Sequence, residues 1–141
     1  MKRLLVIITG ATALVCASCA IEHGKDKEQA SKLIAKFHEW VQTEQLDSIW
    51  SLTDPKFREA GPQEKFNALL HAIKTKLDKV KESNQVAWTV NNTIGNGSYY
   101  TVVYKTTFEQ GEGNESFNFK TGNDTLSLVG YNIQSMDLIT K

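Results

Sequence analysis

The hydrophobic pattern changes once along this chain of 141 residues, and that change most constrains how the chain can fold. Between Lys25 and about Lys81, apolar residues recur three and four positions apart, which is the spacing of amphipathic helices. After Asn84, apolar and polar residues alternate, as they do in strands that bury one face. A helical half followed by a β half predicts an α+β domain.

Three helices are expected in the first half. The first starts near Lys25 and carries its apolar side chains on one arc: Ala30, Leu33, Ile34, Phe37, Trp40 and Val41. A short second helix over 45–52 ends before Asp54-Pro55, because the residue before a proline avoids the helical conformation. The third begins at Gly61-Pro62, since proline suits the first helical position, and extends to about Lys81.

Four strands are expected in the second half, separated by three turns. The strands lie around 86–91, 99–108, 117–119 and 126–139, with glycine-containing turns at 95–97, 111–114 and 122–124. The last strand changes its buried parity, which predicts a bulge near Gly130 or near Gln134-Ser135. The two halves together predict N-terminal helices packed on one face of a curved four-stranded antiparallel sheet.

The N-terminus has the features of a secretory signal. Lys2 and Arg3 form a short basic region, and the apolar run over 4–15 that follows is too short to span a bilayer. Beyond Cys19 the sequence turns polar. We therefore expect residues 1–18 to be a cleaved signal peptide.

Cys19 is the expected lipidation site. It follows the small residues Ala17 and Ser18, and this stretch resembles a bacterial lipobox, although Cys16 stands where an aliphatic residue is usual. The resemblance implies at least two acyl chains, which hold a protein stably on a membrane. We expect a tether over 19–26, at most about 25 Å long when extended, and a single domain over 27–141. The alternative is ordinary cleavage at an Ala-x-Ala-like site, which would leave a soluble secreted protein.

The composition argues against a nucleic-acid partner. Cleavage after residue 18 removes Lys2 and Arg3, so 14 basic residues would face 16 acidic ones, a formal charge of −2. Binding to phosphates requires a basic excess on one face. The same cleavage removes Cys16, so no disulfide can form within the mature chain and stability must come from packing.

Patterns typical of catalytic or metal sites do not stand out. The segment His38-Glu39-Trp40-Val41-Gln42 lacks the second histidine that zinc proteases place four residues after the first. We expect His38 on the flank of its helix, exposed to solvent, and His23 and His71 lie elsewhere. Scattered histidines and no spare thiol indicate neither a serine triad nor a cysteine nucleophile. We therefore expect no metal, no cofactor and no enzymatic activity.

Several local patterns resemble those of the cystatin-like or nuclear-transport-factor-like α+β cone, in particular bacterial lipoproteins of unknown function built on it. The segments that carry the resemblance are 46–50 (Leu-Asp-Ser-Ile-Trp), 55–57 (Pro-Lys-Phe), 66–77, 104–108 (Tyr-Lys-Thr-Thr-Phe) and 130–133 (Gly-Tyr-Asn-Ile). Such families often have Leu-Gly near the end of the long helix, whereas Asp78 follows Leu77 here. The resemblance implies a cone fold but no particular activity, because this fold hosts isomerases, hydrolases, transport factors and binding modules.

Aromatic side chains are the weak candidates for a ligand pocket at the open end of such a cone. They are Trp40, Trp50, Trp88, Tyr100, Tyr104 and Tyr131. Isomerases with this fold use a tyrosine and an acid inside the cavity, so an enzyme would pair one of these tyrosines with an acid such as Asp54, Glu109 or Asp137. Spacing alone does not show which pair meets, and packing is the expected role of tyrosines on a sheet.

The sequence thus predicts a lipid-anchored protein of the bacterial cell envelope, on its periplasmic or surface side, attached to a membrane through Cys19. The expected function is a non-enzymatic binding or assembly module for a small ligand or a neighbouring protein. Two alternatives stay open. One is a cone-cavity enzyme with a buried tyrosine and carboxylate; the other is an inhibitory or assembly factor that acts through its sheet face, at Tyr99, Thr101 and Val103.

Overall fold

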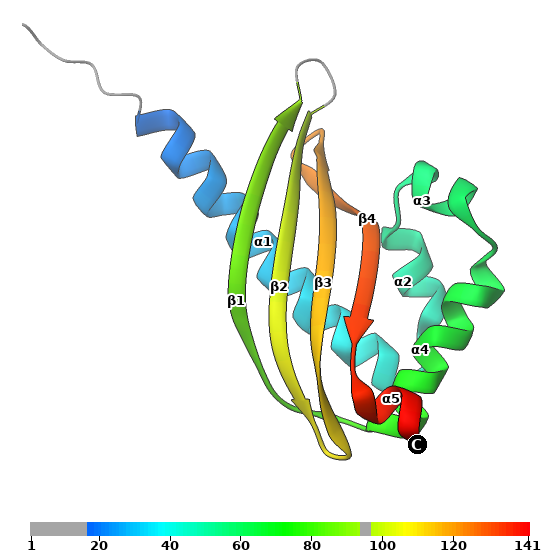
Figure 1. The fold of residues 1–141 in the computed structure, drawn as a ribbon. Coiled ribbons are helices and arrows are strands. Elements are labelled where there is room, and N and C mark those ends of the chain that lie inside the picture. Colours follow the sequence, from blue (N-terminus) through cyan, green and yellow to red (C-terminus); the bar gives the residue numbers. More distant parts are fainter. Residues whose placement is uncertain (1–16, 94–96) are drawn as a thin grey trace, which may run out of the picture.

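The computed structural model describes residues 17–93 and 97–141, with side chains for 24–92 and 97–141. Figure 1 shows helices followed by a twisted antiparallel sheet, which confirms the predicted α+β class. The helical half comprises α1 (Ala17–Gln42), α2 (Leu46–Leu52), α3 (Pro55–Ala60) and α4 (Gln63–Leu77). The sheet comprises β1 (Val80–Thr93), β2 (Gly97–Phe108), β3 (Gly111–Gly122) and β4 (Thr125–Gln134), and the short α5 (Met136–Thr140) follows.

The four strands form one antiparallel sheet in the order β1-β2-β3-β4. Trp88, Val102, Phe117 and Tyr131 lie side by side across it and all face the helices, because alternate residues of a strand point to one face. A register shift beside Asn118 lets β4 change parity and confirms the bulge predicted near Gly130. This bulge allows both halves of β4 to bury their apolar side chains.

Several predicted boundaries differ from the structure. Pro55 begins an additional helix, α3, because the side chain of Asp54 caps it by accepting a hydrogen bond from the N–H of Lys56. The last strand ends at Gln134 rather than at residue 139, because Ser135 caps α5 by accepting from the N–H of Leu138. The first strand begins at Val80, six residues earlier than its alternating pattern, in a stretch that contains two register shifts.

Helix α4 ends where this chain has Asp78 and the resembled families often have glycine. Asp78 has φ 64° and ψ −150°, a conformation that favours glycine. The backbone carbonyl of Asp78 accepts a hydrogen bond of 3.0 Å from the side chain of Gln42 on α1. The chain therefore makes at Asp78 the turn for which the resembled families often use glycine, and α4 ends at Leu77 rather than near Lys81.

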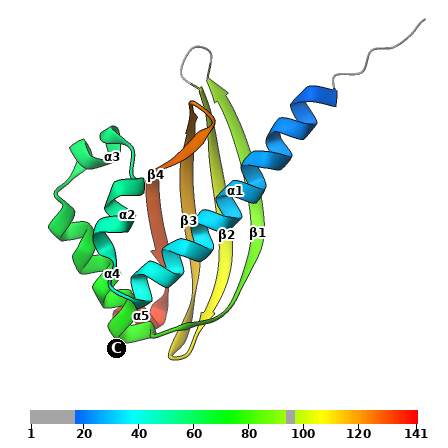
Figure 2. The same ribbon diagram turned by 180° about the vertical axis from the view of Figure 1, so that it is seen from behind.

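The core lies between α1 and the inner face of the sheet (Figure 2). Ala30, Ile34, Phe37 and Val41 are buried, so the predicted apolar stripe of the first helix is confirmed. The ring of Phe37 meets that of Phe117 edge to face, with centroids 5.2 Å apart. Large side chains fill the concave side of the sheet, and each fully buried one contributes about 1.5–3 kcal/mol.

Candidate functional site

A buried glutamate lies in the middle of the inner face of the sheet. Glu115 on β3 is only 1% exposed, and it points inward together with Gly113 and Phe117 because strand residues alternate between faces. Burial of a carboxylate is costly unless the charge is paired and hydrogen-bonded. The surroundings of Glu115 are therefore the first place to look for function.

Three side chains from three different elements donate hydrogen bonds to this carboxylate. Nε2 of His38 on α1 lies 2.8 Å from Oε2, and the hydroxyl of Thr106 on β2 donates to the same oxygen at 2.6 Å. The hydroxyl of Tyr131 on β4 donates to Oε1 at 2.7 Å. Ser83 on β1 lies 2.8 Å from the Thr106 hydroxyl and must donate to it, because the Thr106 proton is directed at Glu115. We call His38, Ser83, Thr106, Glu115 and Tyr131 the Glu115 cluster.

The cluster ties the whole sheet to the first helix. Its members come from α1, β1, β2, β3 and β4, so every strand contributes one hydrogen-bonding group. His38 was expected on the surface, and that prediction is wrong, because its side chain is only 13% exposed. Its flanking position on the helix, next to Phe37, lets the ring lie over the inner face of the sheet, where Glu115 attracts it.

The electrostatics of the cluster favour an ionised glutamate and a neutral tyrosine. Burial by itself would raise the pKa of Glu115, but the hydrogen bond and charge of His38, with the donors Thr106 and Tyr131, outweigh it and hold that pKa below its usual value. Burial and then the charge of Glu115 raise the pKa of Tyr131 well above its usual value. Glu115 thus accepts three hydrogen bonds, and its lowered pKa makes it a weak proton acceptor.

A shallow hollow adjoins the cluster between α1 and β1. Its volume is about 150 Å³, and its lining consists of Ser31, Ile34, Ala35, His38, Ser83 and Tyr104. Within the described residues, Nδ1 of His38 makes no hydrogen bond. This nitrogen and the acceptor lone pairs of the Ser83 hydroxyl are the groups of the cluster that can contact a small polar molecule in the hollow, while Glu115 fixes the orientation of the ring.

A second tyrosine–carboxylate pair lies near the start of the domain. The hydroxyl of Tyr100 on β2 donates to Asp26 on α1 at 2.5 Å, and both residues are buried. Burial and the hydrogen bond to Asp26 raise the pKa of Tyr100. Asp26 belongs to the segment expected as a tether, yet in the structure residues 19–26 are part of α1. Cys19 lies in the first turn of that helix, whereas its side chain is outside the described residues.

The six aromatic candidates do not gather around one pocket. Tyr104 lines the hollow beside His38, and Tyr131 belongs to the Glu115 cluster. Trp88 packs against Tyr100 with ring centroids 5.0 Å apart, and Trp40 is partly buried against the core. Trp50 lies apart from these, in an aromatic group on α2 to α4.

Of the three acids named as possible partners of the tyrosines, Glu109 is exposed and the other two have structural roles. Asp54 caps α3, and Asp137 accepts a hydrogen bond from the backbone N–H of Glu112. The carboxylates that meet tyrosines are Asp26 and Glu115 instead. The inward parity that Glu115 shares with Phe117 and Phe119 was the one sequence signal that could have found it.

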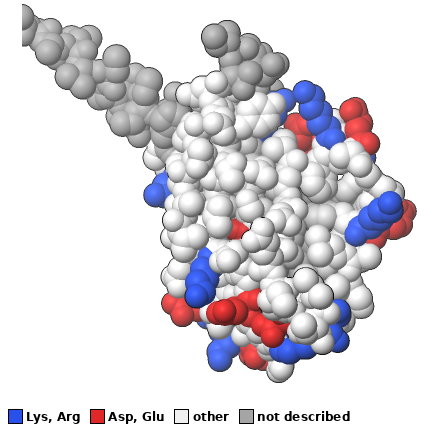
Figure 3. Space-filling model, viewed as in Figure 1, with Lys and Arg blue, Asp and Glu red and all other residues white. Residues whose placement is uncertain are grey.

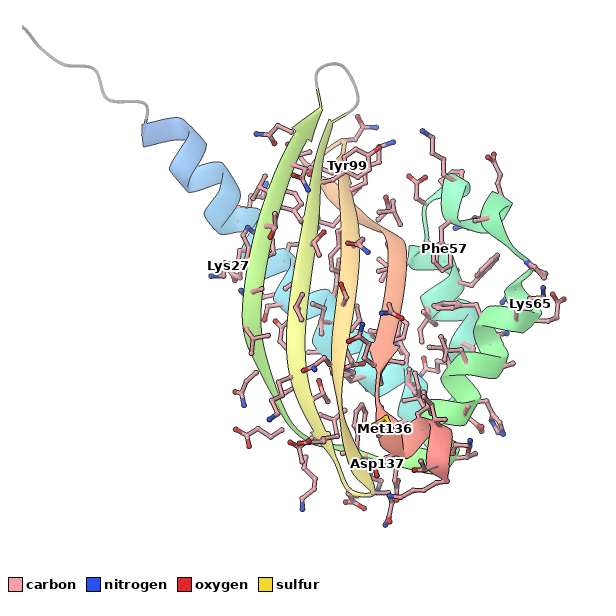
Figure 4. The ribbon with its side chains drawn as sticks, viewed as in Figure 1. Lys27, Phe57, Lys65, Tyr99, Met136 and Asp137 are labelled. Atoms are coloured by element: carbon pink, nitrogen blue, oxygen red, sulfur yellow. The ribbon has the colours of Figure 1, made fainter. Side chains whose placement is uncertain are left out.

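The outer face of the sheet forms a second candidate surface. Figures 1 and 2 show that the helices cover one face of the sheet and leave the other open. Tyr99, Thr101 and Val103 share the outward parity of β2, and the register places Ser116 and Asn118 beside them on β3. In Figure 3 this face is largely free of charged residues, and Figure 4 shows Tyr99 at its end near the β1–β2 hairpin.

No family model matches the chain, and no curated protein matches it. Among the residues described, no group of three or more histidine, cysteine, aspartate or glutamate side chains is placed to hold a metal ion. No helix in the described part of the chain combines the length and the apolar character that a membrane span requires.

Proposed function

We propose that this chain is a lipid-anchored protein of the bacterial cell envelope whose domain docks a neighbouring protein through the outer face of its sheet, without catalysing a reaction. The observation that carries the proposal is the open, uncharged centre of that face. Its central residues on three strands are Thr89, Thr101, Val103, Ser116 and Asn118. A sheet face that contacts only water would normally carry charged side chains at its centre.

The composition of the outer face matches that of a protein interface. Interfaces are poor in charge at their centre and polar at their rim, and aromatic side chains serve as anchors. Here Tyr99 supplies a partly exposed ring at one end, while Lys105 and Glu112 bring opposite charges to the other end, 3.9 Å apart. The centre offers hydroxyl, amide and β-branched groups, which suit a partner of similar neutral polarity.

The packed interior supports a surface rather than a cavity as the binding element. Phe37, Phe117 and Phe119 are buried at the centre of the concave side, and the rings of Phe37 and Tyr131 lie 4.8 Å apart. The Glu115 cluster links all four strands from within, so the outer face is held in one shape. A preformed surface binds with a smaller loss of entropy than a flexible one.

The attachment part of the proposal depends on Cys19. Its support is the pair of small residues before it and the apolar run upstream. Replacement of Cys19 by serine should move the protein from the membrane fraction to the soluble fraction and abolish labelling with a fatty-acid probe. A wild-type protein that takes no label and stays soluble would contradict this part alone, because the docking face does not include Cys19.

The docking face can be tested with a matched pair of substitutions. A photo-crosslinking amino acid at Thr101 in intact bacteria should capture a defined partner protein, identified by mass spectrometry. Val103→Glu places a charge at the centre of the face and should abolish the capture. Ile139→Glu makes the same change at a residue 77% exposed on α5, outside the sheet, and should leave it intact. Capture that survives Val103→Glu would rule out this face.

One observation favours a second candidate, a cone-cavity enzyme. The Tyr131–Glu115 contact is the kind of buried tyrosine–carboxylate pair that such an enzyme would use. We place it second because a catalytic base needs a pKa near the working pH, whereas the pKa of Glu115 is lowered. A reaction found for this protein that Glu115→Gln abolishes while the fold is retained would reverse the order.

A further inference from the structure

An aromatic hollow lies on the helical side of the molecule, away from the outer face of the sheet, and one of its rings, Phe66, contacts Tyr131 of the Glu115 cluster with centroids 6.4 Å apart. The rings of Trp50, Phe57 and Phe66 come from α2, α3 and α4, with centroid distances of 5.0 Å for Phe57–Phe66 and 6.1 Å for Trp50–Phe57. None of the three rings is fully buried, so each keeps part of its surface open. Figure 4 shows Phe57 and Lys65 on this side of the molecule, from neighbouring helices.

The hollow has the size of a small ligand. Its volume is about 270 Å³, and its lining consists of Trp50, Phe57, Ala60, Gly61, Pro62, Lys65 and Phe66. Sites for drug-sized molecules usually measure about 300–1,000 Å³, so this one suits a molecule built around a single ring. Aromatic walls favour such a ring, because offset and edge-to-face contacts are attractive.

The charges around the hollow indicate which charge a ligand should carry. Lys65 is the one charged residue of the lining, and within the described part of the chain it has no ion-pair partner. The guanidinium of Arg58 lies 6.0 Å from the Trp50 ring and donates to the backbone carbonyls of Trp50, Ser51 and Thr53. Arg58 thus places a second cation beside Trp50, close to the hollow although not part of its lining. Both cations favour an anion.

We propose that this hollow binds a small aromatic carboxylic acid, with the ring against Phe57, Phe66 and Trp50 and the carboxylate on the ammonium of Lys65. The site does not involve Tyr99, Thr101 or Val103, so it stands independently of the docking face. A flexible chain of two or three bonds between ring and carboxylate would allow both contacts, because Lys65 lies at the rim and carries a long, mobile side chain.

A series of three probes with one shape tests the proposal. The probes are 3-phenylpropionate, its primary amide and 3-phenylpropylamine, titrated into the isotopically labelled domain while NMR spectra are recorded. The acid should shift the indole signal of Trp50 with a Kd in the millimolar range, and it should bind more tightly than the amide and the amine. The indole signals of Trp40 and Trp88, which lie elsewhere, serve as internal controls.

Two lysine substitutions locate the carboxylate. Lys65→Gln should raise the Kd of the acid about three-fold, since a partly solvated ion pair contributes little to binding, and it should leave the Kd of the amide unchanged. Lys81→Gln, at an exposed lysine outside the hollow, should change neither. The proposal is overturned if the acid leaves the Trp50 signal in place, if the amine binds as tightly as the acid, or if Lys65→Gln has no more effect than Lys81→Gln.

Discussion

Replacement of Glu115 by glutamine should destabilise the domain far more than its small chemical change suggests. Three donors lose a charged acceptor, and each hydrogen bond to a charged group is stronger than its neutral counterpart by about 1 kcal/mol. The glutamine amide would also turn an N–H toward His38 and Thr106 or toward Tyr131, which donate to the carboxylate in the wild type and would have to change tautomer or rotate in order to accept. We therefore expect a loss of about 3 kcal/mol or more in the free energy of unfolding, a large share of the 5–15 kcal/mol typical of a domain.

Denaturant titration followed by tryptophan fluorescence measures this loss, and the same strand supplies the control. Glu112→Gln removes the same charge at an exposed position and should change the free energy of unfolding by less than about 0.5 kcal/mol. His38→Gln combined with Glu115→Gln should cost less than the sum of the single variants, because the two side chains share one interaction. Equal midpoints for wild type and Glu115→Gln would refute the assignment of Glu115 as a buried, ionised centre.

Three further outcomes follow from the same geometry. The pKa of Glu115 is lowered in the folded state, so the ionised side chain stabilises the fold fully above the unfolded pKa of about 4.3. This stabilisation is lost as the pH falls below that value. The midpoint of denaturant unfolding should therefore drop in acid more steeply for the wild type than for Glu115→Gln. The pKa of Tyr131 is raised in the folded state, so the unfolded chain loses the tyrosine proton at a lower pH than the folded one. The free energy of unfolding should therefore fall as the pH rises above about 10, and Tyr131→Phe should reduce that fall. Asp78→Gly should stabilise the domain by about 1 kcal/mol in thermal unfolding because it removes backbone strain at φ 64°, and an unchanged or lower midpoint would contradict the strain.

The order and type of most elements could be predicted from periodicity alone. The stripe of α1, the helix after Pro62 and the turn near Asn123 are set by local spacing and turn chemistry, and the structure contains all three. The boundaries that were wrong depend on single contacts between distant residues or on caps. One example is α5, whose cap Ser135 also donates to the carbonyl of Glu112 on β3.

The Glu115 cluster could not be predicted because it joins residues as far as 77 positions apart. A glutamate between glycines, asparagines and serines carries no local sign that it is buried; only its parity with Phe117 and Phe119 indicates it. His38 was assigned to the surface from its angle on an isolated helix. The buried carboxylate of Glu115 on the sheet binds His38 and draws its side chain inward. The periodicity of a single helix does not show which groups the neighbouring sheet presents to it.

The geometry of α1 connects the two halves of the proposed function. An extended tether over 19–26 would let the domain tumble at up to about 25 Å from the membrane, whereas seven helical steps from Cys19 to Asp26 measure only about 10 Å. The Asp26–Tyr100 contact then fixes the helix to β2, next to Tyr99. In the proposed anchored protein, the Tyr99 end of the docking face therefore lies nearest the membrane and the Lys105–Glu112 end lies farthest from it. A partner seated along this face must itself stand close to the membrane, so crosslinks from Tyr99 should reach its membrane-proximal part and crosslinks from Lys105 its distal part.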